Sequence, residues 1–191
     1  YKKKYGIAYC YMPAFTQQLG FIGNEKLVTN EMLQQLQDFV KYASPYINFD
    51  NSHFAKVNNC VVRNNFILSL EQSYASIKKN YKKSMAYSLS KAKKQNLQYV
   101  VSDNINEAVS MYEAYNREKM LHVTMEDYKS LKRLLKQLYS KQQIIVRKAV
   151  NANGETLSIV LLMQDEKRYY NIINATTELG RKSESNYFLY N

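Results

Sequence analysis

QIIVRKAVNANGETLSIVLLMQDEKRYYNIINA, residues 143–175, contains three apolar runs separated by two short polar turns. The runs are Gln143–Val150, Glu155–Gln164 and Arg168–Ala175, each rich in β-branched or aromatic residues, as is typical of strands. The pair Asn153 and Gly154 is the strongest two-residue hairpin signal in the chain, because both residues accept positive φ. The stretch therefore predicts a three-stranded antiparallel meander.

One further strand and two helices are predicted before this meander. Leu97–Ser102 is a short β-branched run. Asp103 or Asn104 can cap the helix that follows it. Thr124, with Asp127 three residues later, has the spacing of a capping box and begins a second helix. The order strand, two helices, meander predicts a mixed α+β domain.

Ser73–Asn96, SYASIKKNYKKSMAYSLSKAKKQN, holds seven lysines and no acid. Its apolar spacing predicts one helix of about six turns. Lys78 with Lys82 and Lys79 with Lys83 are like-charged i,i+4 pairs, which weaken a helix. Two interpretations stay open for these four lysines: a solvated face of a helix packed on the core, or an anion-binding patch. The expected core-facing stripe consists of Tyr74, Ile77, Tyr81, Met85, Leu89 and Ala92.

The first part of the chain predicts strands and one helix. We expect strands at Tyr5–Cys10, Tyr46–Phe49 and Asn65–Leu70, and a helix that follows the N-cap Thr29 and ends before Pro45. The chain opens without Met, and its last residues are still apolar and helix-like. We therefore expect it to begin and end inside a longer protein.

The composition indicates a globular protein with a local excess of positive charge. The 191 residues are 46% hydrophobic and carry a formal net charge of +11. The charge favours a polyanionic partner such as nucleic acid, a nucleotide, a phosphorylated substrate or an anionic membrane surface. No apolar run of about 18 residues or signal peptide is present, so a cytoplasmic location is expected. Cys10 and Cys60 match no metal or redox spacing; free thiols are the default, and a bridge between them stays open.

The sequence contains no P-loop, dinucleotide fingerprint, metalloprotease motif or nucleophile elbow. One stretch, Thr176–Asn186, combines chemistry with a predicted strand-to-helix junction. Here Gly180, Arg181 and Lys182 precede a helix expected to start between residues 183 and 185. Free N–H groups at a helix start, with adjacent cations, bind phosphate or pyrophosphate.

The element order resembles the first two-thirds of the GNAT acyltransferase fold. Three stretches are similar to the FemABX-like branch of that superfamily: Met12–Gly20 (MPAFTQQLG), Asn65–Leu97 and Arg168–Asn191. The resemblance implies a GNAT-like sheet with flanking helices, and two such domains in tandem. Residues 1–70 would be the C-terminal part of the first, and residues 71–191 the N-terminal two-thirds of the second.

The resemblance also implies an activity, which is transfer of an acyl or aminoacyl group to an amine. The donor would be acyl-CoA or aminoacyl-tRNA, with no metal. The acceptor could be a nucleotide- or lipid-linked precursor of the cell wall or of a surface glycan. Backbone donors to the oxyanion would assist direct attack of the amine, so no nucleophilic residue is required.

Candidate site residues follow from this resemblance. The candidates for binding the acyl donor are Ala175, Thr176, Gly180, Arg181, Lys182, Ser183 and Asn186. Arg117, Lys119 and Tyr87 are candidates for acceptor binding, and His122 is a weak candidate for a general base. Ala86 and Ser90 stand where the family often has basic residues, and the nearby lysines could replace their charge.

Two other functions remain open. The chain could be a non-catalytic basic module that docks RNA or anionic lipid through Lys78–Lys94. It could also be a degenerate GNAT-like scaffold without activity.

Overall fold

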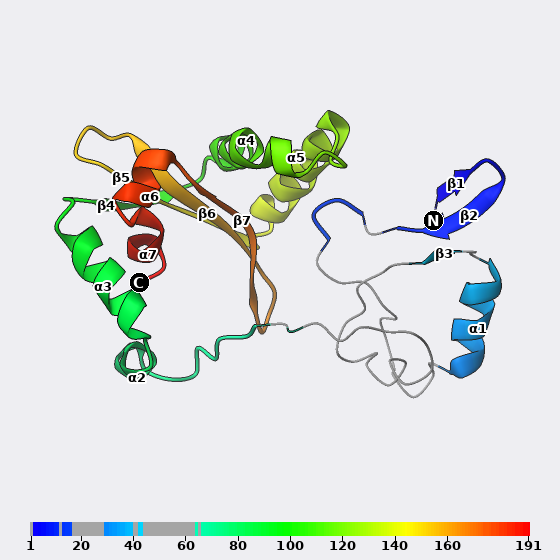
Figure 1. Cartoon of the computed structure of the whole chain (residues 1–191), viewed down its shortest axis with the longest axis horizontal. Coiled ribbons are helices and arrows are strands. Elements are labelled where there is room, and N and C mark those ends of the chain that lie inside the picture. The colour runs from blue at the N-terminus through cyan, green and yellow to red at the C-terminus, as the bar shows by residue number, and fades with distance from the viewer. Residues whose placement is uncertain (1, 12, 17–28, 40–41, 44–63, 65) are drawn as a thin grey trace. The chain divides into compact units, whose positions relative to one another are not determined.

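The computed structural model describes all residues except 1, 12, 17–28, 40–41, 44–63 and 65. The chain divides into two compact units, Tyr1–Leu68 and Ser69–Asn191, and each is described separately below (Figure 1). Among the described residues, no helix combines the length and the apolar character needed to cross a membrane.

The first unit begins with a hairpin. β1 (Lys2–Lys4) pairs antiparallel with β2 (Ile7–Cys10) across the two-residue turn of Tyr5 and Gly6. Both turn residues have positive φ, 51° and 79°, as the right-handed twist of a tight hairpin requires. β2 also pairs in parallel with β3 (Tyr42–Ala43). α1 (Asn30–Phe39) lies between them in sequence.

Several predictions fall in this unit. The strand predicted at residues 5–10 is confirmed as β2, and the helix after Thr29 is confirmed as α1. The strand predicted at 46–49 and Cys60 lie outside the described residues. Cys10 is half-buried and forms no disulfide with a described residue.

The strand predicted at Asn65–Leu70 is wrong over its described residues. Residues 66–70 have no regular structure, and Phe66, Ile67, Leu68 and Leu70 are 60% to 91% exposed. A strand needs a neighbour to accept and donate its backbone hydrogen bonds. No described strand pairs with these residues.

The second unit is built on a four-stranded antiparallel sheet. Its strands are β4 (Gln98–Ser102), β5 (Ile144–Val150), β6 (Thr156–Gln164) and β7 (Tyr169–Thr176). They lie side by side in the order β4-β5-β6-β7, and every neighbouring pair is antiparallel. The predicted meander and the strand before it are confirmed, and so is the mixed α+β class.

Two helices cover one face of this sheet (Figure 1). α4 (Ile105–Asn116) packs on β6 and β7, and α5 (Met125–Ser140) packs on β5. The short 3-10 helix η3 (Arg117–Lys119) follows α4. Both predicted caps are present: Asn104 caps α4, and Thr124 with Asp127 forms a capping box at α5. Local hydrogen bonds therefore fix where these helices begin.

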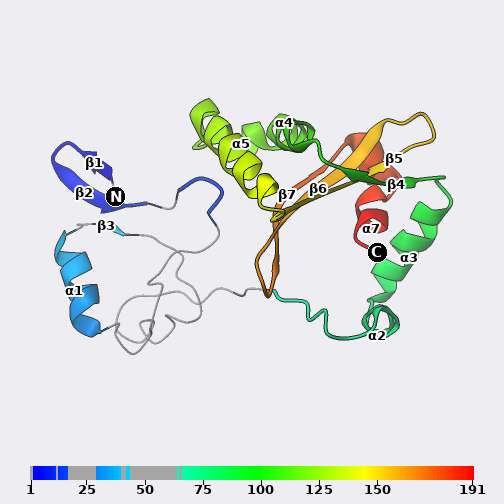
Figure 2. The same ribbon diagram turned by 180° about the vertical axis from the view of Figure 1, so that it is seen from behind.

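Two short helices pack on the opposite face (Figure 2). α6 (Glu178–Lys182) follows β7 directly, and α7 (Ser185–Leu189) lies against β5 and β6. Leu189 of α7 joins Ala149 and Val160 in a buried cluster. The sheet is thus covered on both faces, as the apolar strands β5 and β6 require.

The lysine-rich stretch is broken, and the prediction of one long helix is wrong. It forms α2 (Tyr74–Lys79) and α3 (Lys83–Lys93), separated by residues 80–82. Lys82 is extended, with φ −60° and ψ 150°. Lys78 lies in α2 and Lys82 within the break, while Lys79 and Lys83 lie on either side of it. The i,i+4 repulsion of a continuous helix therefore does not arise in either pair.

The predicted core stripe is only partly buried. Leu89 and Ala92 in α3 are 5% and 0% exposed. Ile77, Tyr81 and Met85 are half-buried, and Tyr74 is exposed. The buried end of the stripe is the part of α3 that packs against α7.

Candidate functional site

The pairing between β6 and β7 is interrupted by one extra residue. Asn171 lies opposite Leu162 and Ile173 opposite Leu161, so that Ile172 has no partner residue in β6. Such a bulge disrupts the backbone hydrogen bonds of the ladder locally, and bulges occur often beside active sites. The ladder between β6 and β7 is therefore interrupted in the middle of an otherwise regular strand.

Polar side chains gather on both sides of this bulge. The side-chain amides of Asn171 and Asn174 both donate to the hydroxyl oxygen of Tyr190, at 2.6 Å and 3.0 Å. Burial raises the pKa of Tyr190, and the two amide hydrogen bonds offset part of this rise. The hydroxyl therefore keeps its proton at neutral pH, and two donors hold its oxygen in place.

The junction after β7 differs from the prediction. Gly180 lies inside α6, where residues 176–182 were expected to form a loop before the next helix. Thr177 caps this helix, and its Oγ1 accepts a hydrogen bond from Gly180 N at 2.8 Å. A tertiary contact requires glycine at this position: a Cβ at Gly180 would overlap the carbonyl oxygen of Leu157 and lie 2.8 Å from Ser185 Oγ. Gly180 allows α6 to approach β6 closely.

The other residues predicted to bind the donor surround this junction. Ala175 is buried and Thr176 is half-buried at the end of β7, and Arg181 and Lys182 are exposed. Ser183 is buried, and its hydroxyl donates to the carbonyl oxygens of α6, at 3.0 Å and 3.2 Å. The hydroxyl of Ser183 is thus already used within the protein.

Three buried polar atoms near the junction have no hydrogen-bond partner among the described residues. They are Ser158 Oγ, Ser185 Oγ and Asn186 Oδ1. Ser158 lies opposite Thr176 in the sheet, and Ser185 and Asn186 open α7. Because leaving a buried polar atom unpaired costs about 1 to 3 kcal/mol, such atoms indicate that water or a ligand group completes this region.

The structure brings the lysine-rich stretch against the same region. α3 packs on α7, and Lys91 Nζ lies 3.3 Å from Glu184 Oε1 at the start of α7. Tyr74 of α2 donates a hydrogen bond of 2.7 Å to Asn191 Oδ1. Two groups of residues that the sequence predicted separately are therefore neighbours.

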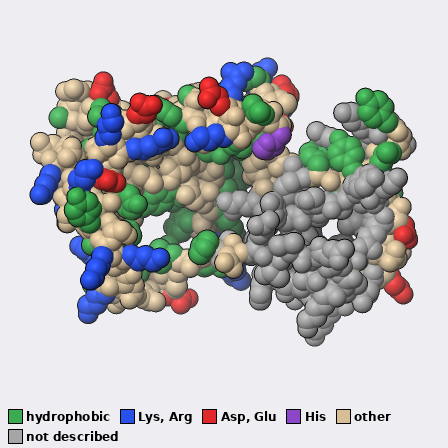
Figure 3. Space-filling view, in the orientation of Figure 1, with side chains coloured by type: hydrophobic (Ala, Val, Ile, Leu, Met, Phe, Trp, Pro, Cys, Tyr) green, Lys and Arg blue, Asp and Glu red, His purple; other side chains and the backbone are tan. Residues whose placement is uncertain are grey.

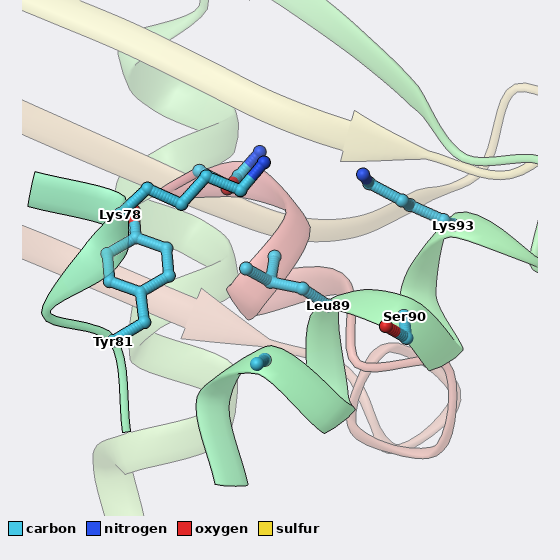
Figure 4. Close-up of a pocket in the computed structure, with 7 residues that line it drawn as sticks. Lys78, Tyr81, Leu89, Ser90 and Lys93 are labelled. Carbon is cyan, nitrogen blue, oxygen red and sulfur yellow. The ribbon is translucent and has the colours of Figure 1, made fainter. Parts of the chain in front are cut away.

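A pocket of about 210 Å³ lies along the lysine-rich helices. Figure 4 shows the lysine side chains extending over Leu89 from opposite sides, with the ring of Tyr81 below one of them. The residues that line the pocket are Lys78, Tyr81, Ala86, Leu89, Ser90, Lys93 and Asn191.

The other predicted anion-binding lysines lie outside the pocket. Lys79, Lys82 and Lys83 are exposed, and no carboxylate in the described part of the chain pairs with them. Figure 3 shows Lys and Arg side chains, in blue, over the part of the surface where Figure 1 draws α2 and α3. Tyr87, predicted to contact the acceptor, is 73% exposed and does not line the pocket.

Two of the residues predicted to bind the acceptor and the weak candidate for the general base are not brought to this region. Arg117, Lys119 and His122 are exposed and follow the end of α4. In Figures 1 and 2 the turn between α4 and α5 lies on the far side of the sheet from α7. These three residues and the lysines of α2 and α3 therefore do not form one site within the second unit.

A separate polar cluster lies under α4. Glu107 accepts hydrogen bonds from Thr156 Oγ1 at 2.6 Å and from Lys148 Nζ at 2.9 Å and 3.1 Å. Burial raises the pKa of Glu107, but the hydrogen bonds of Thr156 and Lys148 and the charge of Lys148 outweigh it, so that the pKa is lowered. This cluster ties α4 to the sheet and leaves no free acid or base.

No family model matches the chain, and no curated protein or solved structure matches it either. In the part of the chain that the structure describes, no group of three or more His, Cys, Asp or Glu residues could hold a metal ion. The case for a function therefore rests on the residues themselves.

Sequence reasoning missed the bulge and the hydroxyl beside it. The signal for the bulge was present: Ile172 and Ile173 are consecutive apolar residues in a strand with polar Asn171 and Asn174 on either side. A regular strand alternates between its two faces, so Asn171 and Asn174 can contact one hydroxyl only when an extra residue shifts the alternation. Tyr190 itself carries no such signal.

Proposed function

We propose that this chain belongs to an N-acyltransferase similar to the FemABX-like branch of the GNAT superfamily. It transfers an acyl or aminoacyl group from acyl-CoA or aminoacyl-tRNA to an amine. The observation that carries the proposal is the bulge at Ile172 of β7, with Tyr190 held beside it. The order β4, α4, α5, β5, β6, β7, α6 supports it, since the resemblance implies this order.

The bulge supplies what acyl transfer needs. In the transition state the carbonyl oxygen of a thioester or ester gains negative charge, and fixed backbone N–H groups stabilise that charge better than water does. A donor lying along β7 would place its carbonyl against the backbone at the bulge, where Ile172 has no partner residue in β6. Its phosphates would lie toward Arg181 and Lys182, which are exposed at the end of α6.

The proposed acyl transfer requires no nucleophilic residue of the protein, because the acceptor amine is itself the nucleophile. The acceptor amine attacks the carbonyl carbon, a C–N bond forms, and the C–S or C–O bond of the donor breaks. The amine loses one proton to water or a base, and the leaving thiolate or alkoxide takes up one proton. Tyr190 is protonated at neutral pH and is held by two amides, so that it can donate to the carbonyl or to the leaving group.

Calorimetric titration of the chain with CoA and acetyl-CoA, with filter binding of aminoacyl-tRNA, tests the donor assignment. We expect one of these donors to bind. Replacing Arg181 and Lys182 together by Gln should weaken that binding about tenfold or more, because charge-assisted hydrogen bonds to phosphate are lost. Lys136→Gln combined with Lys141→Gln is the matched control, since both lysines are exposed on or next to α5, on the other face of the sheet.

No binding of any donor would refute the assignment. Equal weakening by the control pair would show that the effect comes from net charge alone. A turnover assay with an amine acceptor then separates an active enzyme from a degenerate scaffold.

The exposed lysines favour a second candidate, which is docking of a polyanion such as RNA or an anionic lipid surface. No described carboxylate pairs with Lys79, Lys82 or Lys83. Binding of this kind falls steeply with salt. It should be lost when these three lysines and Lys78 become Gln, whereas donor binding at Arg181 and Lys182 should be unchanged.

A further inference from the structure

We propose that the pocket between α2, α3 and Asn191 binds an amphiphilic anion, meaning a phosphate or carboxylate group carried on an apolar chain. The proposal does not depend on acyl transfer. It rests on the two kinds of side chain that line the pocket: cations at its rim and apolar groups at its floor.

The head group would lie between two lysines. Lys78 belongs to α2 and Lys93 to the last turn of α3, and both line the pocket. Neither has a carboxylate partner in the described part of the chain, whereas Lys91 on the same helix is paired with Glu184. Two ammonium groups at one pocket repel each other unless an anion lies between them.

The break between α2 and α3 creates this arrangement. In one continuous helix, Lys78 and Lys93 would lie about 22 Å apart along the axis, since each residue adds about 1.5 Å. The turn at residues 80–82 lets α2 fold toward α3, so that both lysines reach one pocket (Figure 4). Ser90 and Asn191 add polar groups at the same rim.

The floor of the pocket is apolar. Leu89 is 5% exposed, and the ring of Tyr81 is half-buried. Ala86 has the smallest side chain of the three and leaves room above α3. A volume of about 210 Å³ corresponds to about seven water molecules at about 30 Å³ each. An inorganic anion would leave much of this space unfilled, and an alkyl chain would fill it.

An amphiphile fits these features better than RNA does. Binding of single-stranded RNA uses exposed aromatic rings on which bases stack, and Tyr81 is the one aromatic residue that lines the pocket. Lys78 also lies over the ring of Tyr74, with Nζ 5.5 Å from the ring centroid. This contact orients the ammonium group at the rim.

The test compares three probes on the full chain by calorimetry or NMR titration: hexyl phosphate, inorganic phosphate and hexanol. Hexyl phosphate should bind at least about tenfold more tightly than inorganic phosphate, because each buried methylene strengthens binding about fourfold. It should also bind at least about tenfold more tightly than hexanol, which offers no anionic group to the two lysines. Equal affinity for inorganic phosphate would refute the apolar part of the proposal. Equal affinity for hexanol would refute the anionic part.

Substitutions of residues that line the pocket test whether hexyl phosphate binds there. Lys78→Met and Lys93→Met keep the apolar stem of each side chain, and each should weaken hexyl phosphate about tenfold. Ala86→Leu fills the floor without changing charge and should weaken hexyl phosphate while leaving the circular dichroism spectrum intact. Lys136→Met is the control, since Lys136 is exposed on α5, on the other face of the sheet, and does not line the pocket.

The same variants distinguish the source of the ligand. Loss of binding to phosphatidylglycerol vesicles in Lys78→Met and Ala86→Leu would support a membrane lipid. Loss of hexyl phosphate binding alone would support a free metabolite. Unchanged hexyl phosphate affinity in all three pocket variants, or displacement of hexyl phosphate by a short RNA, would overturn the proposal.

Discussion

Lys148 Nζ lies 2.9 Å from Glu107 Oε2 and 3.1 Å from Glu107 Oε1, and this ion pair joins β5 to the first turn of α4. The side chains are 20% and 27% exposed. Thr156 of β6 adds a third hydrogen bond to the same carboxylate. One side chain of α4 thus connects two strands, which holds the helix in place over the sheet.

This cluster predicts how stability depends on pH. The pKa of Glu107 is lowered in the folded protein from its ordinary value of 4.5, so that folding favours the carboxylate. The ionised Glu107 side chain therefore stabilises the fold at pH values above the pKa it has in the unfolded chain. This stabilisation is lost as the pH falls through the pKa of Glu107 in the folded protein. Wild type should exceed Glu107→Gln by about 1 kcal/mol in free energy of unfolding at neutral pH, and the difference should shrink below about pH 4.

Urea unfolding at several pH values measures this difference. Glu118→Gln is the control, since Glu118 is exposed in η3 and forms no ion pair with a described residue. A constant difference between wild type and Glu107→Gln across the acid range would contradict the prediction.

Gly180→Ala should destabilise the second unit, although alanine is normally the better helix residue. The gain from propensity is about 1 kcal/mol. The added Cβ would overlap the Leu157 carbonyl oxygen, and backbone of β6 or α6 would have to move; overpacking of this kind costs about 1 to 3 kcal/mol. We expect a lower midpoint in thermal unfolding.

Gly154→Asn is the control for the Gly180→Ala variant. Nothing lies within 4 Å of a Cβ at Gly154, and its φ is +81°, which Asn accepts more readily than other residues. Its thermal midpoint should stay near that of wild type. A midpoint for Gly180→Ala at or above wild type would show that the contact with Leu157 relaxes freely.

Thr124→Ala should weaken the start of α5. Thr124 N donates to Asp127 Oδ2 at 2.8 Å, and Asp127 N donates to Thr124 Oγ1 at 3.2 Å. Losing a capping box costs about 1 kcal/mol. Thr124→Ser keeps the hydroxyl and should keep the stability. Chemical unfolding measures the free energy of unfolding of both variants. Equal losses of stability in Thr124→Ala and Thr124→Ser would contradict the prediction, because they would assign the effect to the methyl group of Thr124 and not to the cap.

Tyr190→Phe should destabilise the contact between the end of α7 and β7. Both Asn171 and Asn174 lose their hydroxyl acceptor, at a cost of about 1 kcal/mol. NMR should show changed side-chain amide resonances for these two residues. In an active acyltransferase kcat should fall more than KM rises.

Tyr187→Phe provides the comparison, since Tyr187 is 42% exposed and its hydroxyl forms no hydrogen bond with a described residue. It should leave stability, amide resonances and kcat unchanged. A stability loss without any effect on kcat in Tyr190→Phe would assign the hydroxyl a purely structural role.

The elements that the sequence predicted well are those set by contacts between near neighbours. Asn104 caps α4 through a bond to Glu107 N, three residues away. The turn at Asn151–Gly154 closes through Gly154 N to Asn151 O. Hydrogen bonds over so few residues depend little on the rest of the fold, and the sequence is enough to place them.

The site was predicted only in part. The sequence indicated the lysines of α2 and α3 and the polar residues after β7. The sequence did not predict that these two groups of residues are neighbours. Lys91 and Glu184 are 93 residues apart in the chain, yet their side chains are 3.3 Å apart in the structure. No periodic pattern reports a contact of that kind.

The sequence by itself determined the order of β4, α4, α5, β5, β6 and β7, the antiparallel meander and the caps, since side-chain periodicity and short-range hydrogen bonds specify these. The tertiary structure decided the break between α2 and α3, the inclusion of Gly180 in α6, the position of Ile172 outside the β6–β7 pairing and the pocket between Lys78 and Lys93. Each of these depends on packing between segments that are distant in sequence. Such packing outweighs local propensities of a few tenths of a kcal/mol per residue.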